Sequence, residues 1–284
     1  MHHYFPCFLN EDNSVLSIVF TVCRVIKCDA LYFRRRKYMI FFCFSSKDRH
    51  SIVEALLYHI MNYELPVWYD RQQMLLGDNR DYKNFTEGVD KASYFIIVLS
   101  PNSIASVCAN EEIELIRKKH LNTNVVVFPL FYNINACDIP NEYSWMKQLV
   151  YKEIKKDEDV YSACNHIVCK VLIDEISKYK FQSINLLCNE CKNIPMQSFV
   201  SEMLNKYAAI DNNNYNCKIT ILYSIYIFIK NTYSLSSIPE YYYAGMDRLF
   251  ASTKLNLTID LRETIIFERL TLLLLNSVLF GYVI

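Results

Sequence analysis

The sequence predicts an α/β protein with a doubly wound parallel sheet, followed by a mostly α-helical region. Short, unbroken apolar runs rich in β-branched and aromatic residues recur in the first half of the chain. Such runs are typical of strands covered on both faces, and they stand at residues 38–44, 66–69, 94–99 and 125–131. Stretches with a helical period separate them. Strands that alternate with helices indicate parallel βαβ units, and hence this fold class.

The strand at 94–99 and the helix after it organise the first domain. The apolar run 94–99 is ended by Ser100-Pro101-Asn102, because proline has no N–H for a sheet ladder and asparagine favours turns. The helix expected at 107–120 begins with acidic residues and ends with basic ones, which suits the helix dipole. In open α/β sheets, ligands bind at the carboxyl ends of the strands. The carboxylates nearest that edge are Glu111, Glu112 and Glu114.

The remaining elements of this domain follow from turn residues and apolar stripes. Ser45 and Asp48 are good N-caps for the helix expected at 50–63. A polar loop at 71–81 contains Gly77 and Asp78. Further helices are expected at 82–91, 141–155 and 160–179.

Both ends of the chain lie outside this alternation. Residues 1–37 have no clear period and are interpreted as an N-terminal extension. Residues 181–284 are interpreted as a helical C-terminal domain, with helices near 196–209, 216–232, 241–251 and 260–284. The β-branched stretch 219–229 leaves a strand open as an alternative. The apolar run 270–284 is shorter than the roughly 20 residues that span a bilayer, so a buried helix is favoured over a membrane anchor.

Composition excludes some classes of protein. The chain has 284 residues, of which 52% are hydrophobic, so it can form a large core and does not resemble a disordered chain. Lys plus Arg equals Asp plus Glu at 30 each, so net charge gives no argument for a nucleic-acid partner. The basic run 34–37 is interpreted as a solvated entry to the next strand rather than as a binding patch.

Eleven cysteines in a chain of this length favour reduced thiols and a cytoplasmic location over a disulfide framework. The apolar stretch 15–22 follows Glu11 and Asp12 instead of a basic segment, so a signal peptide is not expected. Cys188 and Cys191 form a single CxxC pair without a second pair at zinc spacing, and no metal is expected there.

Four boxes in the first domain resemble a TIR (Toll/interleukin-1 receptor) domain over residues 38–180. The first box is residues 41–49 (FFCFSSKDR), and residues 67–70 with 76–78 (VWYD and LGD) are similar to the second strand and the BB loop. Residues 85–93, which include Gly88, resemble the following helix. Residues 98–113 resemble the third-strand box with its S-x-W-C-x-x-E motif. Each box alone is weak, but four in order at the family's spacing are specific.

The resemblance implies a flavodoxin-like sheet with the first and third strands adjacent, and an enzyme that cleaves NAD+ at the nicotinamide–ribose bond. The glutamate of the motif, counted from Ser106, is Glu112. NAD+ would be the substrate, and no separate cofactor is expected. A carboxylate suits this chemistry, because the ribose becomes cationic and nicotinamide leaves as a neutral molecule.

Further site residues are expected around Glu112. Phe44 and Trp68 are candidate walls for a stacked ring. The candidate polar contacts to NAD+ are Ser45, Ser46, Lys47 and Asp78, and Cys108 stands beside the nicotinamide.

One departure from the family pattern bears on activity. Cys108 stands where the motif has tryptophan, which removes a large stacking surface. Cys108 is interpreted as a packing residue rather than a nucleophile, because the motif has no histidine to activate it. Glu112 has a second interpretation as well, because a carboxylate in the first turn of a helix stabilises that helix.

Two functions follow from the resemblance. The first is an NAD+-cleaving effector in antiphage or immune signalling, which self-associates through the BB loop at 71–81 and is switched on by a trigger that the C-terminal domain senses. It would give ADP-ribose or a cyclic isomer. The alternative is a non-catalytic adaptor that signals through TIR–TIR contacts alone, which has no need of Glu112.

Overall fold

The computed structural model describes residues 40–180, 182–192, 198–233, 235, 238–254 and 261–280. The N-terminal extension, the apolar stretch 15–22 and the basic run 34–37 lie outside these residues. The first part of the described chain is a parallel sheet in the order β2-β1-β3-β4-β5. Its strands are β1 (Ile40–Cys43), β2 (Val67–Trp68), β3 (Tyr94–Leu99), β4 (Val126–Tyr132) and β5 (Lys152–Ile154). The strands β1 and β3 are neighbours, so the expected reversal of strand order is confirmed.

Helices cover both faces of the sheet, because successive strand residues point to opposite sides. Ile40 and Phe42 pack in one core with residues of α2 and α6, whereas Phe41 and Cys43 pack in a second core with residues of η3 and α5. The helical elements of this part are η1 (Ser46–Asp48), η2 (Arg49–Val53), α2 (Glu54–Met61), α3 (Asp70–Gln73), η3 (Tyr82–Val89), α4 (Pro101–Ile104), α5 (Val107–Asn122), η4 (Ala136–Asp138), η5 (Asn141–Gln148) and α6 (Asp157–Ile176). Of these, η2 and η3 are π-helical and η1, η4 and η5 are 3₁₀ helices.

The structure corrects the elements expected between residues 100 and 155 in two places. The helix expected at 141–155 is wrong beyond Gln148, where the chain becomes extended and forms β5. This strand pairs only with β4, and its three residues are too few and too polar for an apolar run. The short loop expected after β3 contains α4, because Ser100 caps a new helix and Pro101 occupies its first turn.

The rest of the described chain is helical. It contains α7 (Ile184–Lys192), α8 (Ser198–Ala209), α9 (Tyr215–Thr232), α10 (Glu240–Lys254) and α11 (Leu261–Phe280). The strand alternative for 219–229 is wrong, since these residues lie within α9. The interpretation of the C-terminal run as a buried helix is confirmed as far as the described residues reach, because 270–275 of α11 are buried. Within the described ranges, no helix combines the length and hydrophobicity that a membrane span requires.

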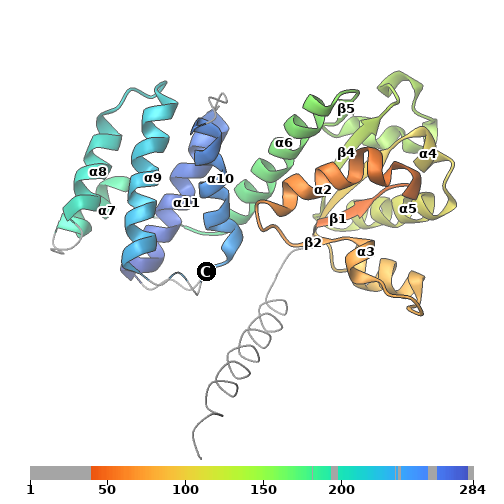
Figure 1. Cartoon of the computed structure of the whole chain (residues 1–284), viewed down its shortest axis with the longest axis horizontal. Helices are drawn as coiled ribbons and strands as arrows, with labels where there is room; N and C mark the ends of the chain where they lie inside the picture. Colours follow the sequence, from red (N-terminus) through yellow and green to blue (C-terminus); the bar gives the residue numbers. More distant parts are fainter. Residues whose placement is uncertain are drawn as a thin grey trace, which may run out of the picture.

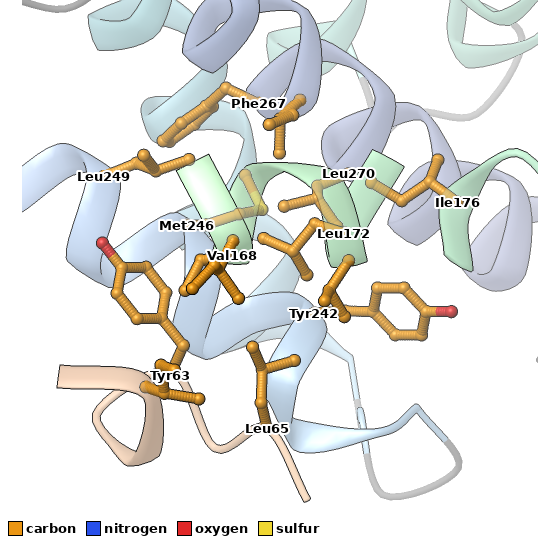
Figure 2. Close-up of a cluster of buried hydrophobic side chains, with 14 of the residues drawn as sticks. Tyr63, Leu65, Val168, Leu172, Ile176, Tyr242, Met246, Leu249, Phe267 and Leu270 are labelled. Atoms are coloured by element: carbon orange, nitrogen blue, oxygen red, sulfur yellow. The ribbon is translucent and has the colours of Figure 1, made fainter. Parts of the chain in front are cut away.

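The helix α6 lies between the sheet and the helical part (Figure 1). Its buried residues belong to a core that includes residues of both parts. Figure 2 shows the region of this core around Leu172. The contributing side chains are Tyr63 and Leu65 from the turn before β2, Val168, Leu172 and Ile176 from α6, Tyr242, Met246 and Leu249 from α10, and Phe267 and Leu270 from α11. Arg248 of α10 also donates to the backbone oxygen of Asn62, at the end of α2, at 3.1 Å. The domain boundary expected near residue 180 therefore comes directly after α6, whose buried residues belong to a core that the sheet and the helical part share.

Replacing Gly88 by alanine is expected to destabilise the fold. A Cβ at this position in η3 would lie 2.6 Å from Cε2 of Phe41 and 3.3 Å from Cδ2 of Trp68, and both rings are buried. Alanine favours helices over glycine by about 1 kcal/mol, but overpacking a buried core costs about 1–3 kcal/mol, so the net effect is a loss. Urea denaturation measures it, with Thr86→Ala on the exposed side of η3 as the control. Equal or greater stability of Gly88→Ala would contradict this prediction.

Candidate active site

Glu112 lies where the sheet reverses its strand order. It belongs to the second turn of α5, which begins at Val107, and the Oγ of Ser106 caps this helix by accepting from the Ala109 N–H at 3.4 Å. Cys43, the last residue of β1, donates from its Sγ to the Ala109 oxygen at 3.6 Å. This contact holds the start of α5 against the carboxyl end of β1. Glu112 is therefore not a first-turn carboxylate, and with 8% of its surface exposed it faces inward.

The environment of Glu112 favours its neutral form. Removal from water raises the pKa of its carboxyl to about 8, a shift that the neighbouring Cys43 thiol and the positive charge of Arg80 oppose. The negative charges of Asp70 and Glu111 raise this pKa further. The Nδ2 of Asn84 donates to Oε1 of Glu112 at 2.8 Å. A buried carboxyl with a strongly raised pKa at a ligand-binding edge is typical of a functional group.

Asn84 is brought to Glu112 by the packing of η3 on α5. The ammonium group of Lys119 on α5 donates to the backbone oxygens of Val89, Asp90 and Ala92, at 2.7, 2.6 and 2.9 Å. These three bonds fix the end of η3 against the last turn of α5. Gly88 lets η3 approach the sheet closely. The position of Asn84 is thus set by the backbone of η3.

The loop after β1 is joined to the loop after β3 by Asp48. This residue is 1% exposed, and its carboxylate accepts from the Ser100 Oγ at 2.5 Å and from the Asn102 Nδ2 at 2.6 Å. The expectation that Asp48 caps the next helix is wrong, because its side chain makes no capping bond there. Ser45 is buried and caps η1 by accepting from the Lys47 N–H. Ser46 and Lys47 are exposed at the rim of the site.

Phe44 lies beside an ion pair at the rim. Arg49 donates to both carboxylate oxygens of Asp70, at 2.7 and 2.5 Å, and to the Tyr69 hydroxyl at 2.8 Å. Its guanidinium carbon lies 4.9 Å from the centre of the half-buried Phe44 ring. The ring of Tyr69 stacks on Phe44 at 6.2 Å. Phe44 is therefore held at the end of β1 by a cation and a second ring.

The side chain of Trp68, on the edge strand β2, is buried rather than exposed to solvent. It is 4% exposed, and its ring stacks on Phe41 with the centroids 4.9 Å apart. The structure therefore does not bring Trp68 to the surface beside Glu112, as a stacking wall would require. It packs on Gly88, where it supports η3 from below.

The BB loop reaches α5 through Arg80. This guanidinium donates to the Sγ of the exposed Cys108 at 2.7 Å and to Asp81, and it lies 3.8 Å from Glu111. Arg80 therefore occupies the surface next to the position where the family motif has tryptophan. Asp78, expected as a polar contact, is exposed and accepts from the Leu75 N–H at 2.8 Å, which shapes the loop tip.

Glu111 and Glu112 face different surroundings. An open hollow of about 670 Å³ runs along the outer side of α5, and Glu112 does not line it. Its lining residues are Asp81, Phe85, Val107, Asn110, Glu111, Glu114, Leu115 and Lys118. Glu111 therefore provides a matched control for substitutions of Glu112, because it has the same side chain at the adjacent position and lines the hollow instead of the buried site.

Three residues of this site were not identified from sequence. Asp48 belongs to the first box, but its sequence position suggested a helix cap. Asn84 and Arg80 each lie 28 positions from the α5 residue that they contact, and no local pattern links them. No group of three or more His, Cys, Asp and Glu side chains in the described ranges is placed to hold a metal ion.

The site is a buried carboxyl with an amide donor and a nearby guanidinium at a topological switch point, the place where open α/β sheets bind ligands. The family model of the TIR domain matches residues 40–167. This part of the chain is a TIR domain.

Curated relatives match the same part of the chain. The protein "NAD(+) hydrolase TcpC" of Escherichia coli O6:H1 is 29% identical over 108 residues, 38% of this chain and 34% of its own length. The protein "2' cyclic ADP-D-ribose synthase BtTIR" of Bacteroides thetaiotaomicron is 25% identical over 104 residues, 37% of this chain and 36% of its own. "NAD(+) hydrolase TcpA" of a Theionarchaea archaeon is 28% identical over 103 residues, 36% of this chain and 31% of its own. The matched region spans about a third of each of these relatives.

Among solved structures, the TIR domain of the Toll-related receptor TRR-2 from Hydra magnipapillata matches with a TM-score of 0.37 and 14% identity. The match covers 46% of this chain and 94% of that domain.

Proposed function

We propose that this chain cleaves the nicotinamide–ribose bond of NAD+, with the Glu112 carboxylate as the catalytic group. The observation that carries the proposal is the burial of Glu112 at the switch point, where removal from water raises its pKa to about 8 and Asn84 fixes one of its oxygens. Relatives of this TIR domain are named for NAD+ hydrolysis or for synthesis of a cyclic ADP-ribose. Those names support the same substrate for this chain.

The reaction requires one well-placed negative charge. The bond between ribose C1′ and the pyridinium nitrogen breaks, its electron pair goes to nicotinamide, and the ribose becomes an oxocarbenium ion. The Glu112 carboxylate, within a site largely closed to water, opposes this charge as it develops. Water then adds to C1′ and loses a proton to give ADP-ribose, or a hydroxyl of the same molecule adds to give a cyclic isomer. Nicotinamide leaves as a neutral molecule, so no second carboxylic acid is needed.

The charge on Glu112 depends on the bound substrate. In the free protein, a pKa of about 8 keeps much of the carboxyl protonated at neutral pH. The positive charge of the pyridinium ring favours the ionised carboxylate, because opposite charges a few ångströms apart lower the pKa of an acid. Binding of NAD+ thus converts Glu112 to its active form. Arg80, whose charge already opposes the upward shift, acts in the same direction.

The BB loop and the helical part serve assembly and control in this proposal. Leu75 and Leu76 on the BB loop are 78% and 108% exposed, and apolar side chains at a loop tip suit a contact with a second copy. Such contacts repeat from copy to copy when they join different surfaces of the same protein. The helical part, which shares the core around α6, is the sensor or assembly module. The setting is immune signalling against phage.

A non-catalytic adaptor is the alternative function, and two observations favour it. Cys108, whose Sγ accepts a hydrogen bond from Arg80, stands where the motif has an indole, and Trp68 is buried. A site without a free aromatic surface holds nicotinamide less well. The exposed Leu75 and Leu76 serve an adaptor equally well.

Chromatography of NAD+ reactions separates the two functions. We expect the purified chain to release nicotinamide, faster per molecule as its concentration rises, and the second product peak names the reaction as hydrolysis or cyclisation. Glu112→Ala is the inactive reference, and Glu111→Ala, which changes the hollow and removes an exposed contact at 3.8 Å to Arg80, is expected to retain activity. A wild-type chain that leaves NAD+ intact at every concentration, even when crowded into assemblies, would support the adaptor.

A further inference from the structure

Asn84 holds a buried polar atom that has no partner in the described parts of the protein. The residue is 8% exposed. Its Nδ2 donates to Oε1 of Glu112, and this orientation of the amide is the one that suits the ionised carboxylate, which only accepts hydrogen bonds. The Oδ1 at the other end accepts no hydrogen bond from any described residue. An unpaired buried acceptor destabilises a fold, so such an atom calls for a partner from outside the chain.

The amide cannot turn away to find a partner elsewhere. The backbone of η3 is fixed by the three bonds from Lys119 and by the close packing of Gly88 on Phe41. A rotation of the amide would bring Oδ1 against the Glu112 carboxyl and break the bond at 2.8 Å. Two acceptors therefore lie side by side when Glu112 is ionised, namely the Glu112 carboxylate and Asn84 Oδ1. Neighbouring acceptors of this kind match a ligand with two neighbouring donors.

The ribose next to nicotinamide carries such donors, because its 2′ and 3′ hydroxyls are on adjacent carbons and on the same face of the ring. Glu112 must lie by this ribose to oppose the charge at C1′, and Asn84 is bonded to Glu112. We infer that Asn84 is a substrate-binding residue, whose Oδ1 accepts a hydrogen bond from one hydroxyl of the nicotinamide ribose while its Nδ2 positions Glu112. This inference rests on the proposed cleavage of NAD+. It makes Asn84 a determinant of specificity for ribose over deoxyribose.

The test compares NAD+ with two analogues that lack either the 2′ or the 3′ hydroxyl of the nicotinamide ribose. A site that accepts a substrate hydroxyl rejects the analogue without it, and one such buried bond corresponds to about 10- to 100-fold in kcat/KM. The measured quantity is the ratio of kcat/KM for NAD+ to kcat/KM for each analogue. We expect this ratio to be about 10 to 100 in wild type. Asn84→Leu, which is close in shape to asparagine but has no acceptor, is expected to lose it for one of the analogues. Spontaneous cleavage of each analogue is subtracted. Loss of the Asn84 donor also slows cleavage of NAD+ itself, but this affects all three substrates and leaves the ratio unchanged.

Thr86→Ala is the control variant, since Thr86 is exposed on the same helix and its replacement should leave the ratio at the wild-type value. If Asn84→Leu does not fold, as judged by circular dichroism, Asn84→Ala replaces it. If the chain binds NAD+ without cleaving it, the same ratio is taken from dissociation constants.

The outcomes separate the two proposals. Loss of the ratio in the Asn84 variant, with Thr86→Ala unchanged, supports the inference. A wild-type chain that cleaves NAD+ while the Asn84 variant keeps the full ratio overturns the inference and leaves the proposed function intact. A wild-type chain that neither binds nor cleaves NAD+ overturns both.

Discussion

Replacing Glu112 by glutamine is expected to lower the rate of NAD+ cleavage by about 10³-fold, the upper end of the loss for one preorganised electrostatic contact. Glutamine keeps the shape of the side chain, and its Oε1 can still accept from Asn84 Nδ2, so the fold and the neighbouring bond remain. What disappears is the negative charge that opposes the developing oxocarbenium ion. Glu112→Asp keeps the negative charge but moves it about 1 Å away from the ribose. A displacement of this size is expected to lower the rate of NAD+ cleavage by about 10²-fold. Initial rates of nicotinamide release measure both variants.

A pH dependence of NAD+ cleavage by the wild-type chain is expected from the same carboxyl. The value of kcat/KM reports the free enzyme, in which the pKa of Glu112 is raised to about 8, so it is expected to increase with pH and to level off above about 8. The value of kcat reports the pKa of Glu112 in the complex with the substrate. Because the positive charge of the pyridinium ring lowers this pKa, kcat is expected to rise at lower pH than kcat/KM does. A profile of kcat/KM that is flat from pH 6 to 9 would contradict a role for the ionised Glu112.

The Glu112→Gln variant is also expected to be more stable than wild type above pH 8. The unfolded chain releases the Glu112 proton near pH 4.3, whereas the folded protein holds it until about pH 8. Between these values the folded state binds one proton more than the unfolded state, so wild-type stability falls as pH rises. At about 1.4 kcal/mol per pKa unit, the difference at pH 9 is on the order of a few kcal/mol, and near pH 4 it vanishes. Urea denaturation at both pH values tests this, with Glu111→Gln as the control that should show little change.

A stabilising mutation that removes activity distinguishes a catalytic group from a structural one. If Glu112 served only to stabilise α5, its replacement by glutamine would weaken the fold at every pH. The burial of the carboxyl away from water, without a buried cation as a partner in the described site, destabilises the folded protein at alkaline pH. Enzymes tolerate such a group where it serves the reaction.

The sheet could be read from sequence wherever its strands are buried on both faces. The run 94–99 is fully buried as β3, and its residues match the expected strand at both ends. The edge strand β5 escaped detection because its residues Lys152 and Glu153 are polar, and a strand with one neighbour needs no apolar run. The position of Glu112 followed from the motif and the strand before it. Its burial did not, because the side chain could have faced either way from α5.

The polar partners of Glu112 could not be read from sequence, for a physical reason. Asn84 reaches the site because η3 is π-helical and packs closely on the sheet through Gly88. A π-helix shifts the side chains away from the period of 3.6 residues on which helical patterns depend. Arg80 reaches Cys108 from an irregular loop. Contacts of this kind are set by tertiary packing.

Leu172→Ala is expected to destabilise the protein by about 2–5 kcal/mol, the range for removing a buried leucine side chain from a core that cannot collapse. Leu172 on α6 is fully buried, and its Cδ1 lies 3.3 Å from the place where a Cβ on Gly245 of α10 would stand. In Figure 2 it lies among Leu270, Met246 and Tyr242 of the helical part. The cavity left by alanine would therefore open between α6 and the helices α10 and α11.

Because the core that contains α6 joins one face of the sheet to the helical part, this substitution is expected to weaken the TIR domain and the helical part together. Urea denaturation followed by far-ultraviolet circular dichroism and by the fluorescence of Trp68 and Trp145, which both pack in the second core of the sheet, should give one transition at the same lowered midpoint. Leu121→Ala is the matched control, because Leu121 on α5 is 74% exposed and its loss should change stability by no more than about 0.5 kcal/mol. If the tryptophan fluorescence kept the wild-type midpoint while part of the circular dichroism signal was lost at lower urea, the two parts would be independent units. The helical part would then have no path through α6 by which to control Glu112.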